Sequence, residues 1–280
     1  MARRAIAVRQ RSIIPGFALS LGVTLSYLGL IVIIPLCVLL ILSSEAGWMK
    51  YWVEISSPRT LSAFYVSFGT ALLAAAFNAV CGFVVAWVLV RYDFPGRRLT
   101  DALIDLPFAL PTAVAGISLT QLYAENGWLG PALAAIGLKV AFTPLGIFVA
   151  LVFVGLPFVV RTVQPVLQDF EPEMEEAGAL LGASRWSILR RIVFPPLIPA
   201  VMTGFTLAFA RAIGEYGSVI FIAGNIPGYS EIVPLLIVIK LEQFDYTGAT
   251  VIASLMLVVS FFLLLLINLL EAWMRRQQGG

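Results

Sequence analysis

A charged pair lies within an otherwise apolar stretch of the sequence. Arg211 and Glu215 are four residues apart in Arg-Ala-Ile-Gly-Glu-Tyr-Gly, so on a helix they would share one face, one turn apart. An unpaired charge at the centre of a bilayer costs from about 3 to more than about 10 kcal/mol, so both should face the bundle interior and pair. Arg211 could give an anion path positive potential while Glu215 limits anion binding, or the pair could be structural.

Neutral polar side chains are weaker candidates for the same path. Thr112 and Ser118 could donate hydrogen bonds to an oxyanion, as could Asn78. Polar groups within membrane helices more often bond to a neighbouring helix, so both readings stay open. Gly214 and Gly217, beside the charged pair, are expected to permit close helix contact.

Several reaction chemistries are excluded by the residues that the sequence lacks. There is no histidine, and the two cysteines, Cys37 and Cys81, lie in apolar runs without a Cys-x-x-Cys motif. No lysine follows a glycine, so no phosphate-binding P-loop is present. We therefore expect no catalytic residues, no metal site and no cofactor in this chain. The net charge of +2 gives no indication of nucleic-acid binding.

The composition indicates that lipid surrounds most of the 280 residues. Apolar residues, with glycine not counted, make up 60% of the chain, whereas soluble domains contain about 45–50% even when glycine is included. Charged residues make up 12% of the chain, against about 25% in soluble domains. The sequence predicts an all-α membrane protein with a single transmembrane domain over 1–280. Pro107 and Pro111 interrupt the third of its expected spans. Six runs are long enough to cross a bilayer: about 17–42, 61–90, 102–123, 143–160, 197–223 and 247–270.

The distribution of positive charge predicts the orientation. With the N-terminus in the cytoplasm, 13 of the 18 Lys and Arg residues fall in cytoplasmic segments, including Arg3, Arg4, Arg9 and Arg11 before the first span. The first apolar run is longer than a signal peptide's, so we interpret it as an uncleaved anchor. Both termini are expected in the cytoplasm.

The longest polar interruption, about 161–196, predicts a helix–turn–helix. Acidic residues occupy its first turns, Gly182 can end the first helix in the left-handed conformation, and Ser184 can cap the second. Pro195 is expected to stop the second helix. An amphipathic hairpin at the membrane surface needs a partner against which to bury its apolar face. That face would contain Leu180, Leu181, Trp186, Ile188, Leu189 and Ile192.

This loop resembles the EAA loop of ABC-importer permeases. The resemblance spans about 20 residues and departs from the usual pattern at two positions, with Gly178 in place of Ala and Phe194 in place of Leu. It implies a type I ABC-importer permease fold with a cytoplasmic coupling helix that docks on a separate ATPase subunit, which binds ATP–Mg. Glu176 would face that ATPase, although it could also serve only as a charge at the helix N-terminus. The residues that carry the resemblance are Glu176, Ala177, Gly178, Gly182, Ile192, Phe194 and Pro195.

The resemblance extends over nearly the whole chain to the T-type subunits of sulfate/thiosulfate permeases. It implies a permease subunit, not an enzyme, that works beside a second, W-type permease, two ATPase subunits and a periplasmic sulfate- or thiosulfate-binding protein. A bacterial inner membrane is implied, and a plastid membrane stays open. The matching segments are 14–17, 91–97, 105–116, 157–165, 221–225 and 244–246.

Two alternatives remain at this point. A molybdate or tungstate ABC importer shares the EAA loop, and an ion-coupled secondary anion transporter is compatible with six spans and an intramembrane pair. The sequence does not choose between sulfate and thiosulfate.

Overall fold

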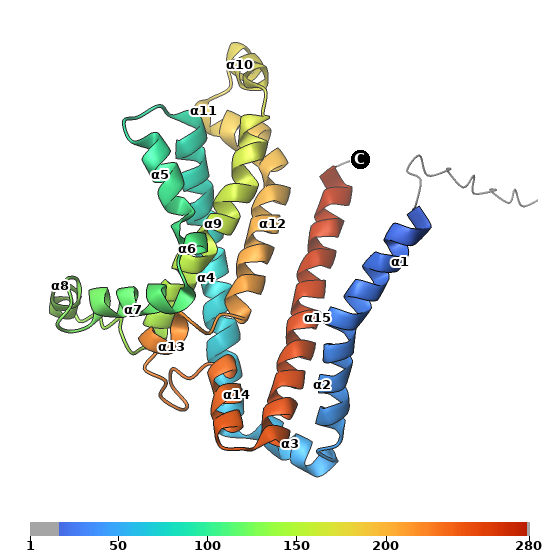
Figure 1. Ribbon diagram of the computed structural model, residues 1–280. Coiled ribbons are helices and arrows are strands. Elements are labelled where there is room, and N and C mark those ends of the chain that lie inside the picture. Colours follow the sequence, from blue (N-terminus) through green and yellow to red (C-terminus); the bar gives the residue numbers. More distant parts are fainter. Residues whose placement is uncertain (1–16, 279–280) are drawn as a thin grey trace, which may run out of the picture.

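Three long helices form the centre of the protein. The computed structural model describes residues 17–278, which contain helices and no strand (Figure 1). Helices α4 (Pro58–Arg91), α9 (Pro144–Gln168) and α12 (Phe194–Ile213) pack against one another and supply most of the buried core. Small residues permit this approach: a Cβ added at Gly82 of α4 would lie 2.8 Å from the Val159 side chain of α9.

Five stretches of helix are long and apolar enough to cross a membrane within the described residues. They are Leu19–Ser44, Pro58–Arg91, Pro144–Gln168, Arg185–Ile213 and Tyr246–Trp273. The expected third span is instead broken into α5 (Arg97–Ile104), α6 (Leu106–Ala109) and α7 (Thr112–Tyr123). Pro111 lies in the break with an extended ψ of 133°, and its ring forbids the hydrogen bond that would continue the helix.

The first and last spans pair at the side of the bundle. The first consists of α1 (Phe17–Leu28), a π-helical turn (Gly29–Ile33) and α2 (Ile34–Ser44), and α2 packs on α15 (Tyr246–Gln278). A buried hydrogen bond of 2.8 Å joins the Ser43 and Ser254 hydroxyls. Arg3, Arg4, Arg9, Arg11 and most of the 14–17 segment, on which sequence predictions rested, lie outside the described residues.

Several span boundaries differ from the sequence prediction, and the fifth span begins at Arg185 where 197 was expected. The fourth span was expected to end near 160, but α9 continues to Gln168, and Arg161 and Gln164 on this extension bond to carboxylates of α5 and the turn after it. The fifth was expected to reach 223, but α12 ends at Ile213. A turn leads from there to the short α13 (Val219–Ile222).

The shorter helices lie mainly near the ends and side of the bundle. Helices α10 (Pro172–Leu180) and α11 (Arg185–Ile188) form a hairpin at the end where α1 begins and α15 finishes (Figure 1). Helices α3 (Trp48–Ser56) and α14 (Val233–Glu242) lie at the opposite end, and α8 (Gly130–Ala135) projects sideways with α7.

Candidate functional site

The hairpin has the local structure that the sequence predicts. Gly182 has a φ of +80°, in the left-handed region that favours glycine, and the chain reverses there. The Ser184 hydroxyl accepts a hydrogen bond of 3.3 Å from the Ser187 backbone N–H and caps the second helix. The predicted turn and cap are both confirmed.

Gly178 sets the distance between the two arms of the hairpin. It is buried, and a Cβ built on it would lie 2.8 Å from Cδ1 of Ile192 and 3.3 Å from Ile188. The absence of a side chain therefore lets both isoleucines pack beneath α10. Ala177, the preceding residue, is exposed.

The expected single apolar face of the hairpin is wrong. Ile188 is buried against the bundle, whereas Leu180 and Leu181 are 89% and 88% exposed and Trp186 is exposed as well. The two sets separate because the isoleucines fill the space left at Gly178, while the leucines lie at the tip of the hairpin. The exposed set forms an apolar tip that no contact within residues 17–278 covers.

The adjacent acids Glu175 and Glu176 have different environments. Arg91, in the last turn of α4, donates a hydrogen bond of 2.5 Å to Glu175, and its guanidinium lies over the rings of Trp87 and Phe170. Glu176 is exposed, and no residue between 17 and 278 forms an ion pair or hydrogen bond with its side chain. Glu175 thus fixes the hairpin to the bundle, while Glu176 is free to meet another molecule.

Pro195 does not stop the second arm as predicted. The helical path runs without interruption from Arg185 to Ile213, through a π-helical turn at Leu189–Val193. Pro195 lies just after this π-helical turn, where the hydrogen-bond pattern of the continuous helix changes and α12 begins. The hairpin is therefore continuous with α12, the helix that carries Arg211.

Arg211 and Glu215 form an ion pair, but not on one helix. Their Nη1 and Oε2 atoms are 2.5 Å apart, yet α12 ends at Ile213 and Glu215 lies in the turn beyond it. Glu215 is 3% exposed and accepts hydrogen bonds of 2.9 Å from the backbone N–H and hydroxyl of Ser218. Arg211 keeps 35% of its side chain exposed. The carboxylate is therefore part of the core, and the guanidinium borders a surface of the chain.

Thr112 lies beside this turn and Ser118 does not. A Cβ added at Gly217 would lie 2.2 Å from the Thr112 hydroxyl, and one added at Gly116 would lie 2.3 Å from the Ser218 carbonyl oxygen. The α7 segment thus packs directly on the turn that holds Glu215. Ser118 is exposed, one and a half turns further along α7.

Two smaller expectations have different outcomes. Asn78 donates to the Val152 carbonyl oxygen across the α4–α9 contact at 3.2 Å, so it bonds a neighbouring helix. The close packing predicted for Gly217 is confirmed, but nothing lies within 4 Å of a Cβ built on Gly214, so the prediction for Gly214 is wrong.

A cluster around Arg161 was missed from sequence. Its guanidinium donates to both carboxylate oxygens of Asp105 at 2.8 and 2.6 Å and to Asp101 at 2.7 Å. The Gln164 side chain donates to Asp101 at 3.0 Å, and this bond, with the Arg161 contacts, holds the pKa of Asp101 below its usual value. The spacing of Asp101 and Asp105 places both on one helical face, which was a visible signal for a shared cation. The cluster ties α9 to the broken third segment.

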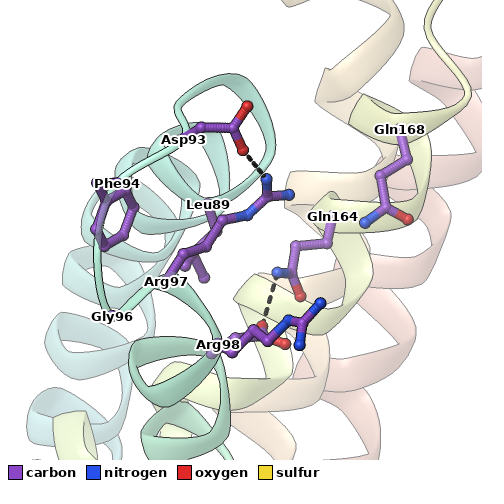
Figure 2. Close-up of a pocket in the computed structure, with 9 residues that line it drawn as sticks. Leu89, Asp93, Phe94, Gly96, Arg97, Arg98, Gln164 and Gln168 are labelled. Atoms are coloured by element: carbon purple, nitrogen blue, oxygen red, sulfur yellow. Dashed lines mark hydrogen bonds and ion pairs between the residues drawn. The ribbon is translucent and has the colours of Figure 1, made fainter.

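A pocket of about 670 Å³ adjoins this cluster, between the α4–α5 turn and the end of α9 (Figure 2). Arg97, paired with Asp93 at 2.6 Å, and Arg98 lie on one wall, and Gln164 and Gln168 on the other. The charges around it are balanced. Residues 17–278 contain no group of three His, Cys, Asp or Glu side chains that could hold a metal ion.

Comparisons with known proteins agree with this architecture. The chain is 48% identical to the sulfate transport system permease protein CysT of Escherichia coli (strain K12), over 98% of this chain and 99% of the relative. It is 52% identical to the protein of that name in Synechocystis sp., over 91% and 89%.

Among solved structures, a bacterial ABC transporter that imports alginate has a chain with a TM-score of 0.75 at 14% identity, covering 92% of this chain and 96% of its own. The MetNI methionine ABC transporter gives 0.55 at 19% identity, covering 82% and 98%. These likenesses show the fold of an ABC-importer permease.

The family described as binding-protein-dependent transport system inner membrane component matches residues 78–276, which include the end of α4, all of α9 and α12, the hairpin and the turn that holds Glu215. The expected permease subunit of an ABC importer, with its all-α membrane fold, is confirmed. The chain belongs to this family of inner membrane components of binding-protein-dependent transport systems.

Proposed function

We propose that this chain is one permease subunit of an ATP-driven importer for sulfate and thiosulfate, forming half of the translocation pathway. The assignment of sulfate as the substrate rests on the 48% identity, over 98% of the chain, to a permease named for sulfate transport. Thiosulfate differs from sulfate by one atom and keeps its charge, so a path selective for divalent tetrahedral anions would admit both.

The exposed hairpin is proposed to be the coupling helix. Leu180, Leu181 and Trp186 form an apolar tip for a groove on an ATPase, and Glu176 supplies a carboxylate at its edge for a cationic partner. Gly178 and Gly182 shape this coupling hairpin, Pro195 lies where it joins α12, and Ala177 would face the ATPase from the exposed side of α10. Each of two ATPase subunits would bind ATP–Mg, so this chain needs no nucleotide site.

The α12–α13 turn is proposed to border the anion path. Arg211 would supply positive potential from its partly exposed guanidinium, and Glu215 would limit that potential so that the anion leaves again. Thr112 packs against the same turn, whereas Ser118 would contribute only from the exposed side of α7. A purely structural pair is the competing reading, and the buried, doubly hydrogen-bonded Glu215 favours it for the carboxylate alone.

The proposed assembly pairs this chain with a second permease of W type, two ATPase subunits and a periplasmic sulfate- or thiosulfate-binding protein, in a bacterial inner membrane. The hairpin, the start of α1 and the end of α15 lie toward the same end of the bundle (Figure 1). The same end carries Arg91, Arg97, Arg98, Arg190 and Arg191, which supports a cytoplasmic location for that end and for both termini.

The test of the substrate is uptake of radiolabelled sulfate into vesicles that contain the whole complex and its binding protein. The proposal predicts uptake that excess unlabelled sulfate or thiosulfate suppresses and that molybdate at equal concentration does not. Suppression by molybdate or tungstate alone would assign the chain to a molybdate or tungstate importer. Uptake that requires an ion gradient and proceeds without ATP would indicate a secondary transporter.

A further inference from the structure

Helix α3 lies across the end of the bundle opposite the hairpin. Helix α2 ends at Ser44, and Gly47 then adopts a φ of +75°, which L-residues rarely take. The chain turns there, and α3 (Trp48–Ser56) runs sideways beneath α2 and α15 (Figure 1).

The two faces of α3 differ in chemistry. Trp48 and Trp52 are one turn apart and stack on each other, with ring centroids 6.3 Å apart. Trp48 is 79% exposed, and Met49, Trp52 and Val53 are exposed beside it. These four side chains form one apolar face, and no other described residue covers it.

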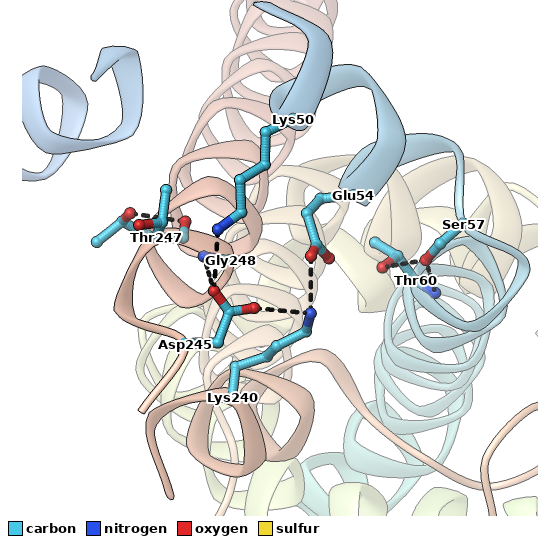
Figure 3. Close-up of polar contacts among 9 residues, drawn as sticks. Lys50, Glu54, Ser57, Thr60, Lys240, Asp245, Thr247 and Gly248 are labelled. Atoms are coloured by element: carbon cyan, nitrogen blue, oxygen red, sulfur yellow. Dashed lines mark hydrogen bonds and ion pairs between the residues drawn. The ribbon is translucent and has the colours of Figure 1, made fainter. Parts of the chain in front are cut away.

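The opposite face is fixed to the bundle by ion pairs (Figure 3). Lys50 pairs with Asp245 at 3.2 Å, and Glu54 pairs with Lys240 at 2.7 Å. Lys240 also reaches Asp245 at 3.0 Å, so the three contacts join α3 to α14 and to the start of α15. The apolar face is therefore held pointing outward, because rotation of α3 would break these pairs.

The position of α3 along the chain places it at the membrane surface. The apolar run of the first span ends at Leu42, only six residues before Trp48. Six residues reach at most about 20 Å when fully extended, and here they contain a helix end and a turn. Phe244 and Tyr246, which flank Asp245, are also exposed at this end. Exposed Trp and Tyr concentrate where lipid headgroups meet acyl chains.

We propose that the face formed by Trp48, Met49, Trp52 and Val53 is a membrane-binding site that inserts into the headgroup–acyl boundary of the phospholipid leaflet at this end. Helix α3 then lies in the interface as an amphipathic helix. Its ion pairs hold α14 and the start of α15 at a fixed position relative to that leaflet. Asp245 neutralises Lys50, so no free cation of α3 accompanies the inserted face. Insertion should therefore not require anionic lipid. This inference needs only the membrane location of the chain and not the identity of the transported anion.

The experiment uses the whole complex, purified through a tag on this chain and reconstituted into phosphatidylcholine vesicles with bromine on either shallow or deep acyl carbons. The double variant Trp48→Phe/Trp52→Phe keeps the face apolar and removes only the fluorophores. Trp186→Phe, on the hairpin at the other end, is the matched control. Each variant complex should elute from a size-exclusion column at the wild-type volume, which shows that it has assembled.

The proposal predicts that shallow bromines quench wild-type fluorescence more than deep ones, and that the double variant loses most of the difference. The fluorescence intensity that is lost to the bromines should be the same in Trp186→Phe as in the wild type, and the same in vesicles that contain anionic lipid. An equal loss of intensity to the bromines in the wild type and the double variant would overturn the proposal. So would shielding of these two tryptophans from aqueous acrylamide only after the periplasmic binding protein is added, because the face would then bind a soluble protein.

Discussion

The Arg91 guanidinium donates a hydrogen bond of 2.5 Å to Glu175 and leaves the adjacent Glu176 exposed. Two consecutive acids thus have separate tasks, since one attaches the hairpin to α4 and the other is available to a partner. Because the second arm of the hairpin continues into α12, one uninterrupted helical path joins the hairpin to Arg211 and to the turn that holds Glu215.

Replacement of Arg211 tests the proposed anion path. Arg211→Gln should reduce sulfate uptake at least about tenfold, the effect of losing roughly 1.4 kcal/mol of favourable potential for the anion. The ATPase should still co-purify, because Arg211 is far along α12 from the hairpin. Arg211→Lys is the matched control and should keep part of the uptake. Normal uptake by Arg211→Gln would make the pair purely structural.

The contact between α7 and the α12–α13 turn should be sensitive to one methyl group. Gly116→Ala would place a Cβ 2.3 Å from the Ser218 carbonyl oxygen, and such overpacking costs about 1–3 kcal/mol. Gly214→Ala is the matched control because nothing lies within 4 Å of its added Cβ. Thermal unfolding of the purified complex should show a lower midpoint for the first variant only. Equal midpoints would contradict this packing.

The Arg161 cluster should stabilise the broken third segment. Arg161→Gln removes the cation that Asp101 and Asp105 share, and we expect a loss of about 1 kcal/mol, because both carboxylates are nearly half exposed and water screens their ion pairs. Hydrogen exchange should become faster in residues 97–109 and not in α3. Exchange that is unchanged in residues 97–109 would show that the cluster does not hold the segment.

Acid should weaken the attachment of α3 through Asp245. The Gly248 backbone N–H and the ammonium groups of Lys240 and Lys50 lower the pKa of Asp245 from 3.8 to about 2. A lowered pKa in the folded state gives stability that is present above about 4 and is lost as the pH falls towards 2. Between pH 5 and pH 3 the loss should be about 1 kcal/mol.

The matched variant for this pH dependence is Asp245→Asn, which has no carboxylate to titrate. Thermal midpoints measured at pH 5 and pH 3 should fall further for the wild type than for Asp245→Asn. Parallel decreases in the two proteins would show that Asp245 does not carry the acid sensitivity.

Local features of the hairpin and the core could be predicted from sequence, because short-range chemistry determines them. Gly182 and Ser184 have the turn and cap roles that their residue types favour, and the apolar runs identify the long helices. The end of α12 at Ile213 could not be predicted, because a spacing of four allows the same ion pair on a helix and across a turn. The partners of Arg161 depend on how the broken segment packs against α9, and no local pattern specifies that packing.

ATP binding on a separate subunit is proposed to drive sulfate through this chain by way of the hairpin. The most direct measurement follows ATP hydrolysis and radiolabelled sulfate uptake in the same vesicles, with wild type, Glu176→Lys and the control Glu173→Lys, which changes an exposed acid in the first turn of α10. The account predicts ATP-dependent uptake for the wild type and the control, and loss of uptake for Glu176→Lys. Full ATP-dependent uptake by Glu176→Lys would contradict it.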